Sequence, residues 1–481
     1  MKALFYHPTS SLAQPEPHVG IGTLIAIARR AGWEVDFFEH DLHAKETSFE
    51  RVLAAFRPDV VAISCMTPQY FHAQTAARNV RRHFPSCKII MGGAHPSALP
   101  VETMNELPEV DCVVAGEGER AFARFLETAG AGVDGANIPG LYCRRDGRVI
   151  VPPPSSLLTQ DELDALPMTD WDTLLKRGLY EQQLNYTTHI VPVFSVISAR
   201  GCPYECTFCS EKLIWQRRVR YRKIEKVVEE IQYLVRQYGA HHFNILDDTF
   251  VLKEERVRQF CELVRPLGIE YRITANANAV TQPMLDALAA SGCRMVAYGV
   301  ESGDENVLRR MKKRQKLDDV REAFRMTKRA GMMAYALCMV GNIGEDFEAV
   351  KRTARFVSTI GADLFSASVM TPYPGSENYE ICKKNGWILT NDWKMWCPSP
   401  VRLRNWKPIV RTDKMDGPMM KRAYYYLNRT YMFARFKRKY GRLYLLNPNF
   451  HRTEVLGRLR VIGMAGMLRH AARLAASVAG R

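Results

Sequence analysis

Long hydrophobic runs are missing from this sequence. No stretch of about 18 or more apolar residues occurs, so no transmembrane helix is expected. The N-terminal stretch Met-Lys-Ala-Leu-Phe-Tyr-His-Pro has too short an apolar run for a signal peptide. The 12 cysteines form no framework of regular pairs, which argues against a disulfide-built secreted domain and suits a reducing compartment. We therefore expect a cytoplasmic protein.

Acidic residues are scarce only near the end of the chain. Residues 401–481 contain 19 Lys and Arg but only three acids, so this region alone accounts for the net charge of +16. The first 400 residues are balanced, with 48 basic and 48 acidic side chains. The basic tail predicts an anionic partner, which could be a membrane surface, a phosphorylated substrate or nucleic acid. The length of 481 residues suggests about three domains.

A group of three cysteines lacks the fourth ligand that a zinc site normally needs. Cys202, Cys206 and Cys209 lie in Ala-Arg-Gly-Cys-Pro-Tyr-Glu-Cys-Thr-Phe-Cys-Ser, and the next cysteine, Cys261, is far along the chain. Thiolates on one short loop can hold an iron–sulfur cluster. Three ligands leave one iron open to an outside ligand, which is typical of a catalytic metal. A zinc loop or three unrelated thiols are the alternatives.

This spacing resembles the signature of the radical S-adenosylmethionine (SAM) superfamily, and the aromatic Phe208 before the last cysteine fits it too. The resemblance implies a 4Fe–4S cluster whose open iron binds the amino and carboxylate groups of SAM. An electron from the cluster then splits SAM into methionine and a 5′-deoxyadenosyl radical. A reductant such as flavodoxin or ferredoxin is the expected partner.

Residues 1–150 alternate strand-like and helix-like segments, which predicts a doubly wound α/β domain. Glycine-containing loops follow several of the expected strands, at the edge where open α/β sheets bind ligands. The expected helix covers residues 22–31. The expected strands are Lys2–Tyr6, Glu34–Phe38, Val60–Ser64, Lys88–Met91 and Cys112–Ala115.

These loops resemble the cobalamin-binding domain that precedes many radical SAM enzymes, in a Rossmann-like fold. Small residues and hydroxyls let a backbone approach a large macrocycle. The Asp-x-His-x-x-Gly motif of cobalt-ligating histidines is absent, and His18 with Gly20 echoes it only loosely, so cobalt ligation by a histidine is not expected. A Rossmann-like module without a cofactor is the alternative. The resemblance assigns as cobalamin contacts Ser64, Thr67, Gly92, Gly93, His95, Gly116 and Glu117.

Residues 191–391 repeat a strand-then-helix pattern six times, which predicts a partial (β/α)6 barrel of the TIM type with its site at the carboxyl ends of the strands. Polar residues follow several of these ends, and a solvated loop or a helix cap is the alternative for each one. The expected strands are Val191–Ser198, His242–Leu246, Tyr271–Ala275, Met295–Val300, Ala334–Val340 and Leu364–Met370. By resemblance, the expected SAM contacts are Phe208, Asp247, Asp248, Asn276, Glu301, Ser302 and Gly341.

Two segments flank this barrel. Residues 151–190 begin with Val-Pro-Pro-Pro and are expected to be a stiff linker. Residues 392–481 are expected to be a basic helical region, with helices over Tyr424–Tyr440 and residues 454–479. Such helices form either a cap on the barrel or a peripheral contact with a membrane. Nucleic acid is not an expected partner, because a methylthiotransferase acting on transfer RNA would carry a second cluster site.

The whole pattern predicts a cobalamin-dependent (class B) radical SAM enzyme that methylates an unactivated carbon of a small-molecule or lipid-like substrate. The resemblance implies one SAM that methylates cobalamin and a second that generates the radical. Radical cyclisation or oxidation, as in the anaerobic magnesium-protoporphyrin ester cyclase, is one alternative. A non-catalytic cobalamin- or membrane-binding protein is the other.

Overall fold

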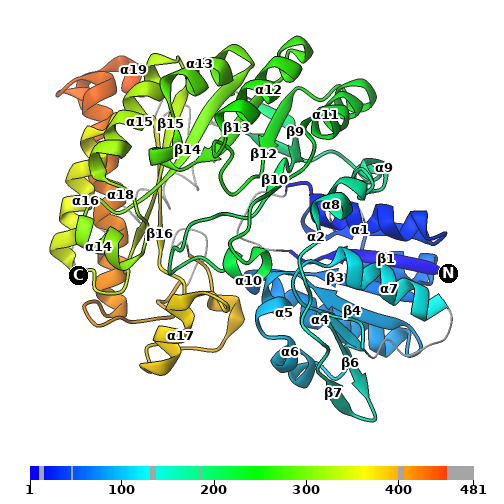
Figure 1. Ribbon diagram of the computed structural model, residues 1–481. Helices are drawn as coiled ribbons and strands as arrows, with labels where there is room; N and C mark the ends of the chain where they lie inside the picture. The colour runs from blue at the N-terminus through cyan, green and yellow to red at the C-terminus, as the bar shows by residue number, and fades with distance from the viewer. Residues whose placement is uncertain are drawn as a thin grey trace.

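The computed structural model describes residues 1–9, 16–44, 47–130, 137–184, 186–187, 189–398 and 406–451. Two large sheets organise these residues, and each has seven strands. The first sheet builds the N-terminal domain, drawn blue to cyan in Figure 1, and the second builds a barrel-like domain drawn green to yellow.

The first sheet has the strand order β2-β1-β3-β4-β5-β6-β7. Strands β1 to β5 are parallel, whereas β6 and β7 add an antiparallel hairpin at the β5 edge. The order reverses between β1 and β3, and ligands bind at such a switch point in open α/β sheets. The strands are β1 (Lys2–His7), β2 (Glu34–Glu39), β3 (Val60–Ser64), β4 (Lys88–Gly92), β5 (Cys112–Val114), β6 (Leu141–Arg145) and β7 (Arg148–Ile150).

Helices cover both faces of this sheet, which is why its central strands are apolar on both sides. Ala3 and Phe5 pack in one core with helices α1 (Val19–Arg30) and α7 (Glu119–Gly130). The alternating residues Leu4 and Tyr6 pack in a second core. Helices α3 (Phe49–Phe56) and α4 (Tyr70–His83) close that second face. The predicted doubly wound domain is confirmed.

The segment expected to be a linker contains regular structure of its own. It forms α8 (Gln160–Ala165), α9 (Trp171–Leu175) and β8 (Glu181–Gln183), and β8 pairs antiparallel with the edge of the second sheet. The fully buried indole of Trp171 donates to the carboxylate of Glu230 at 3.0 Å. The segment therefore packs against the barrel at Trp171 and β8, and its Asp170 also pairs with Arg29 of α1 in the first domain.

The second sheet has six parallel strands in sequence order, and β8 lies at one edge. Each of the six predicted strands overlaps one of these, so the predicted partial barrel is confirmed. The parallel strands are β9 (Ile190–Val196), β12 (His242–Ile245), β13 (Glu270–Ala275), β14 (Cys293–Glu301), β15 (Met333–Val340) and β16 (Leu364–Val369). The helices between them are α11 (Ile224–Tyr238), α12 (Glu254–Val264), α13 (Gln282–Ala290), α14 (Glu305–Arg310), α15 (Leu317–Arg329) and α16 (Phe347–Thr359).

After β16 the chain is helical. Helix α17 (Glu377–Lys384) lies at the mouth of the barrel, and α18 (Gly417–Tyr440) packs along α16 and β16 (Figure 1). Helix α18 contains the predicted helix Tyr424–Tyr440, while the helix predicted over residues 454–479 lies outside the described residues. None of the helices in the described ranges is long and apolar enough to span a bilayer.

Candidate cofactor-binding site

The three cysteines of the motif differ from all others in their exposure. Cys202, Cys206 and Cys209 are half-buried, whereas the other nine cysteines are buried. The backbone N–H of Cys209 donates to the carbonyl of Cys206 at 3.1 Å, which folds the loop back on itself. Burial raises the pKa of Cys202 to about 11 and that of Cys209 to about 12. Nearby carboxylates and the Cys206 thiol make smaller contributions in the same direction. The three sulfur donors on one loop fit a cluster, whose binding must displace the thiol protons.

The start of the cysteine loop depends on a glycine. Gly201 directly follows β10 (Ala199–Arg200), which pairs antiparallel with β11 (Arg220–Tyr221) beyond the cysteine loop, and its φ is +90°. A Cβ at Gly201 would lie 2.3 Å from the carbonyl oxygen of Arg218. No other residue fits this position without moving the backbone.

The end of the loop is held by the barrel. The N–H of Thr207 donates to the carbonyl of Met311 at 3.0 Å, and the carbonyl of Thr207 accepts from Asn378 at 2.9 Å. Phe208, expected to contact SAM, packs against an apolar group on α14 and α16, formed by Val307, Met311 and Ala349. Its side chain therefore anchors the loop to the barrel.

The acids after β12 have different surroundings. The buried carboxylate of Asp247 accepts from the N–H and hydroxyl of Ser198, each at 2.6 Å, and from the N–H of Ala199 at 3.0 Å. Asp247 thus fixes the turn that leads from β9 into the cysteine loop. Asp248 is half-buried, and burial followed by repulsion from Asp247 raises its pKa to about 6. Asp248 also raises the pKa of Cys202, after the larger effect of burial, so it lies beside the cysteines.

A second acid lies next to Asp248. Glu211 begins helix α10 (Glu211–Trp215), directly after the cysteine loop. Burial, followed by repulsion from Asp248, raises the pKa of Glu211 to about 7. Its Oε2 is buried and has no hydrogen-bond partner among the described residues. The two acids can accept hydrogen bonds from a cationic ligand group at the cluster.

One of the two asparagines after β13 binds the cysteine loop. Asn276 is buried, and its Oδ1 accepts from the N–H of Asn278 at 3.4 Å. The Oδ1 of Asn278 accepts from the hydroxyl of Tyr204 at 3.3 Å, and its Nδ2 donates to the carbonyl of Arg314 at 3.0 Å. Tyr204 lies between Cys202 and Cys206, so this contact joins the loop to the barrel.

The end of β14 carries an ion pair that the sequence did not predict. Glu301 has a φ of +60° at a register shift in the strand, and its Oε1 accepts from Lys313 at 3.3 Å. Burial acts to lower the pKa of Lys313, but the carboxylate of Glu301 and the thiol of Cys206 raise it above its usual value. Lys313 is only 8% exposed, so a buried ammonium lies beside the cysteines. In the sequence, Lys313 lies within the run Lys-Lys-Arg, and such a run predicts solvent-exposed side chains.

Two other residues that were expected to contact SAM are buried and bonded within the protein. The buried hydroxyl of Ser302 lies 3.0 Å from that of Thr353 in α16. Gly341 has a φ of +80°, and its N–H donates to Glu345 at 2.7 Å. A Cβ on Gly341 would lie 3.1 Å from Met420 of α18, so this loop lies directly under the helix.

A small-residue edge lies at the carboxyl end of the first sheet. Each of four small residues there is partly exposed. Ser64 and Gly92 end β3 and β4, Gly93 follows β4, and Gly116 follows β5. Gly93 has a φ of +100°, and a Cβ on it would lie 2.5 Å from the carbonyl oxygen of Cys65. The backbone is therefore bare along this edge, which fits the approach of a flat macrocycle.

The bulkier residues predicted for this edge are turned inward. His95 is 1% exposed, stacks on Tyr70 with ring centroids 3.9 Å apart, and has its Nδ1 3.2 Å from the Thr67 hydroxyl. Burial lowers the pKa of His95 to about 3, so the imidazole is neutral. Trp393, from the region after the barrel, meets the same ring edge-on at 4.8 Å. Thr67 and His95 thus support the edge from below.

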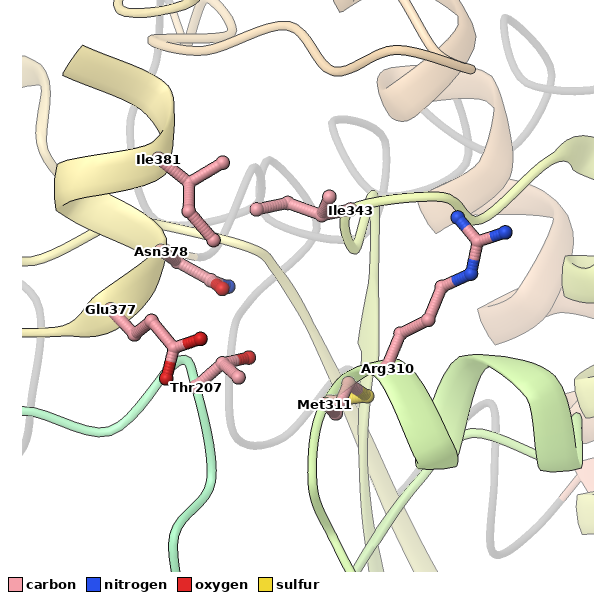
Figure 2. Close-up of a pocket in the computed structure, with 7 residues that line it drawn as sticks. All are labelled: Thr207, Arg310, Met311, Ile343, Glu377, Asn378 and Ile381. Atoms are coloured by element: carbon pink, nitrogen blue, oxygen red, sulfur yellow. The ribbon is translucent and has the colours of Figure 1, made fainter. Parts of the chain in front are cut away.

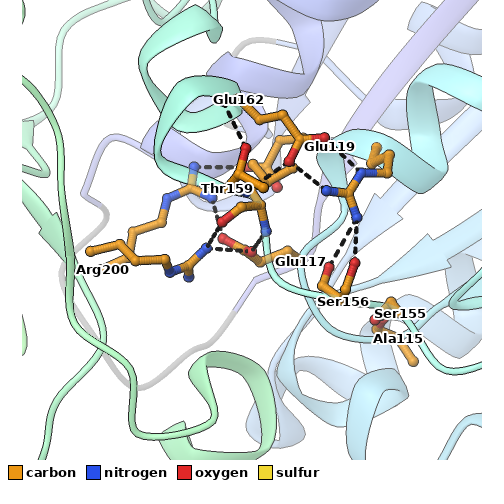
Figure 3. A network of polar contacts seen from close by, with 11 residues as sticks. Ala115, Glu117, Glu119, Ser155, Ser156, Thr159, Glu162 and Arg200 are labelled. Atoms are coloured by element: carbon orange, nitrogen blue, oxygen red, sulfur yellow. Dashed lines mark hydrogen bonds and ion pairs between the residues drawn. The ribbon is translucent and has the colours of Figure 1, made fainter.

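Glu117 joins the two domains. Its Oε1 accepts from Arg200 at 2.8 Å (Figure 3). Its Oε2 accepts from Arg220 at 2.7 Å. Arg200 also donates to Glu119 at 2.6 Å. Burial opposes ionisation of Glu117, but its hydrogen bonds, with Arg220 first, hold its pKa below the usual value. The acidic loop after β5 therefore binds the hairpin that carries the cysteine loop, and Glu117 faces the barrel.

A cavity of about 370 Å3 lies between the cysteine loop and the helices α14 and α17 (Figure 2). Thr207 reaches it from between Cys206 and Cys209, opposite α17 and α14. The lining residues are Thr207, Arg310, Met311, Ile343, Glu377, Asn378 and Ile381.

Each of the two large domains matches a known protein family. The B12 binding domain model matches residues 9–126, and the radical SAM superfamily model matches residues 196–357. The chain belongs to the cobalamin-dependent radical SAM enzymes. An uncharacterized methyltransferase of Pyrococcus horikoshii is 29% identical over 79% of this chain and 81% of its own length. The anaerobic magnesium-protoporphyrin IX monomethyl ester cyclase of Rubrivivax gelatinosus is 25% identical over 79% of this chain and 70% of its own length.

The fold of these cobalamin-dependent radical SAM enzymes is also known from solved structures. The radical SAM methyltransferase TsrM of Kitasatospora setae, solved with cobalamin and a 4Fe–4S cluster, superposes with a TM-score of 0.66 at 17% identity. The match covers 81% of this chain and 76% of that one. The cofactors of the present radical SAM enzyme are a 4Fe–4S cluster, SAM and cobalamin.

Proposed function

We propose that this enzyme transfers a methyl group from SAM, by way of cobalamin, to an unactivated carbon. The contact of Glu117 with Arg200 carries the proposal. Glu117 lies one residue after the small-residue edge of the B12 domain, and Arg200 lies two residues before Cys202. A carbon radical formed at the cluster would thus arise beside the cobalamin domain, where a methyl group can be delivered.

The chain's own residues supply binding and orientation, since the cofactors carry the hard chemistry. Together the cofactors provide a 5′-deoxyadenosyl radical and a methyl donor. In this proposal Cys202, Cys206 and Cys209 hold three irons and leave the fourth to SAM. Asp248 and Glu301 lie beside them, where they can accept hydrogen bonds from the SAM ammonium and ribose.

The cobalamin side of the proposal uses the bare edge of the first sheet. Ser64, Gly92, Gly93 and Gly116 let the macrocycle approach the backbone, with His95 packed beneath as a neutral support. No histidine is assigned to the cobalt. The similarity to a methyltransferase supports methyl transfer over other radical reactions.

The test is anaerobic reconstitution with iron, sulfide and cobalamin, followed by turnover with SAM labelled with deuterium on its methyl group. We expect S-adenosylhomocysteine and 5′-deoxyadenosine to form together, with label in the product. Cys206→Ala should form no 5′-deoxyadenosine and no labelled product while still binding cobalamin. Formation of 5′-deoxyadenosine with a substrate present but without S-adenosylhomocysteine would contradict methyl transfer.

Radical cyclisation or oxidation is the second candidate, and the similarity to the magnesium-protoporphyrin ester cyclase favours it. A cyclase consumes SAM only as a radical source. Equal amounts of 5′-deoxyadenosine and cyclised product, with no labelled methyl in that product, would identify this reaction.

The substrate in this proposal is a small molecule or a lipid, and the basic C-terminal region contacts a membrane surface. Leu443 and Leu446 are 74% and 78% exposed beside Arg442, a combination suited to the interface of an anionic bilayer. Flotation with vesicles containing phosphatidylserine should carry the protein upward at low salt. Protein that stays at the bottom of the gradient would exclude the membrane contact.

A further inference from the structure

Radical chemistry at the cluster needs an electron that enters from outside the protein. We propose that a cationic patch on the outer side of the cysteine loop docks an acidic, low-potential, one-electron carrier protein. The patch consists of Arg217, Arg218, Lys312 and Arg314. It is separate from the buried residues assigned to SAM and cobalamin.

Three members of the patch contact residues that adjoin the cysteines in the sequence. Glu205, between Cys202 and Cys206, accepts from Arg217 at 2.7 Å and from Arg314 at 2.8 Å. The carbonyl of Arg218 packs against Gly201, the residue before Cys202. An electron donor bound here is therefore separated from the cluster by little more than the loop itself.

The cations lie outside the acids that pair with them. The side chains of Arg314, Lys312 and Arg217 are 70%, 47% and 40% exposed. Their partners Glu205 and Glu377 are each 32% exposed. Arg218 is exposed and forms no side-chain hydrogen bond or ion pair with any residue that the structure describes. A partner approaching this face therefore meets positive charge first.

This charge is local. The first 400 residues carry equal numbers of basic and acidic side chains, so the patch does not follow from a generally basic domain. Charge complementarity of this kind raises the rate of encounter, and electron-transfer complexes use small interfaces.

The surface beside the patch is concave. Arg218 borders a cavity of about 780 Å3 between the hairpin and the connector from the first domain. The cavity is lined by Pro154, Ser155, Ser156, Leu157, Leu158, Thr159, Gln160, Gln216, Arg218, Val219 and Arg220. Its position gives a protruding carrier protein a recess beside the patch.

The step at this surface is a single electron transfer. The reduced flavin or iron–sulfur centre of the carrier loses one electron, and the oxidised 4Fe–4S cluster gains it. No bond forms or breaks and no proton is required. The carrier then leaves in its oxidised form.

The test compares reduction of the reconstituted cluster by two kinds of reductant, followed anaerobically by stopped-flow absorbance. Reduced flavodoxin and reduced 2Fe–2S ferredoxin are the acidic protein donors, and reduced methyl viologen is a small cationic donor. In R218E/R314E we expect the second-order rate with either protein to fall about tenfold or more at low ionic strength. The rate with methyl viologen should not fall. Added salt should slow the wild type and bring it towards the variant.

Two further variants keep the result decisive. R51E/R82E reverses two exposed charges on α3 and α4 of the first domain and should behave as the wild type. R218E alone alters no ion pair of the described chain and should lose rate in the same direction if the double variant binds too little iron. Wild-type rates with both protein donors in R218E/R314E and R218E, or an equal loss in R51E/R82E, would overturn the proposal.

Discussion

Arg200 donates to Glu117 at 2.8 Å and to Glu119 at 2.6 Å, with its side chain 10% exposed. These two acids follow the last parallel strand of the cobalamin domain, and Arg200 ends the strand that leads into the cysteine loop. One buried guanidinium therefore links the two cofactor domains. A bidentate or forked arginine suits this role because its geometry is rigid.

Removal of this guanidinium should loosen the interdomain contact. Arg200→Gln leaves two buried carboxylates short of a partner, which typically costs about 3–5 kcal/mol. We expect a lower unfolding midpoint in denaturant and less iron per chain after reconstitution. Arg120→Gln is the matched control, because Arg120 and Glu162 form an exposed pair in the same region, worth about 1 kcal/mol or less. Equal losses in the two variants would argue against a special role for Arg200.

Alanine at Gly93 should disturb the cobalamin edge. The φ of +100° and the carbonyl of Cys65, 2.5 Å from the new Cβ, both oppose the substitution. About 1.4 kcal/mol of strain in the bound loop is a tenfold loss of affinity, so we expect at least that loss for cobalamin. Gly32→Ala is the control, since its φ is +81° but a Cβ there meets open space. Cobalamin titration by absorbance measures both, and unchanged affinity in Gly93→Ala would place the cofactor elsewhere.

Neighbouring lysines should respond very differently to the same substitution. Lys313→Met leaves Glu301 charged and nearly buried, at a cost of about 3–5 kcal/mol, and removes the ammonium beside the cysteines. Lys312→Met breaks an exposed pair with Glu377 and should cost about 1 kcal/mol or less. We also expect weaker SAM binding in Lys313→Met, measured by equilibrium dialysis on the reconstituted protein. Similar stability and SAM affinity in both variants would remove Lys313 from the site.

Acid should destabilise the first domain through His95. The pKa of this imidazole is about 3 in the folded protein and 6.5 in the unfolded chain, so its contribution is complete above pH 6.5 and is lost as the pH falls towards 3. From about pH 7.5 to about pH 5.5 the loss is about 1.4 kcal/mol. His95→Asn should flatten this part of the stability profile of the metal-free protein. The exposed His83→Asn should keep the wild-type slope, and a slope unchanged in both would contradict a buried neutral His95.

The strands that could be predicted from the sequence are those that consist mostly of apolar residues. β3 is Val60–Ser64, as predicted, and each of the six barrel strands was placed within two residues at each end. The hairpin β6–β7, the edge strand β8 and the pair β10–β11 were not predicted. These strands contain charged or polar residues in place of a continuous apolar run, and they exist because a neighbouring strand supplies their hydrogen bonds.

The residues of the candidate site also fall into two groups, those that the sequence predicted and those that it did not. Cys202, Cys206 and Cys209 lie within eight residues of one another, so the sequence alone was enough to predict a cluster site there. Lys313 and Arg200 were missed because a single sequence does not show that a charged side chain is buried. Glu117 was expected at cobalamin, yet both its oxygens face arginines of the barrel.

By itself, the sequence predicted a ligand set for the cluster and determined the two α/β patterns, because ligand spacing and hydrophobic period are properties of neighbouring residues. Only the tertiary structure decided which polar groups face a cofactor edge and which join the domains. Those roles depend on residues such as Glu117 and Arg200, which lie 83 positions apart and meet only when both sheets have folded.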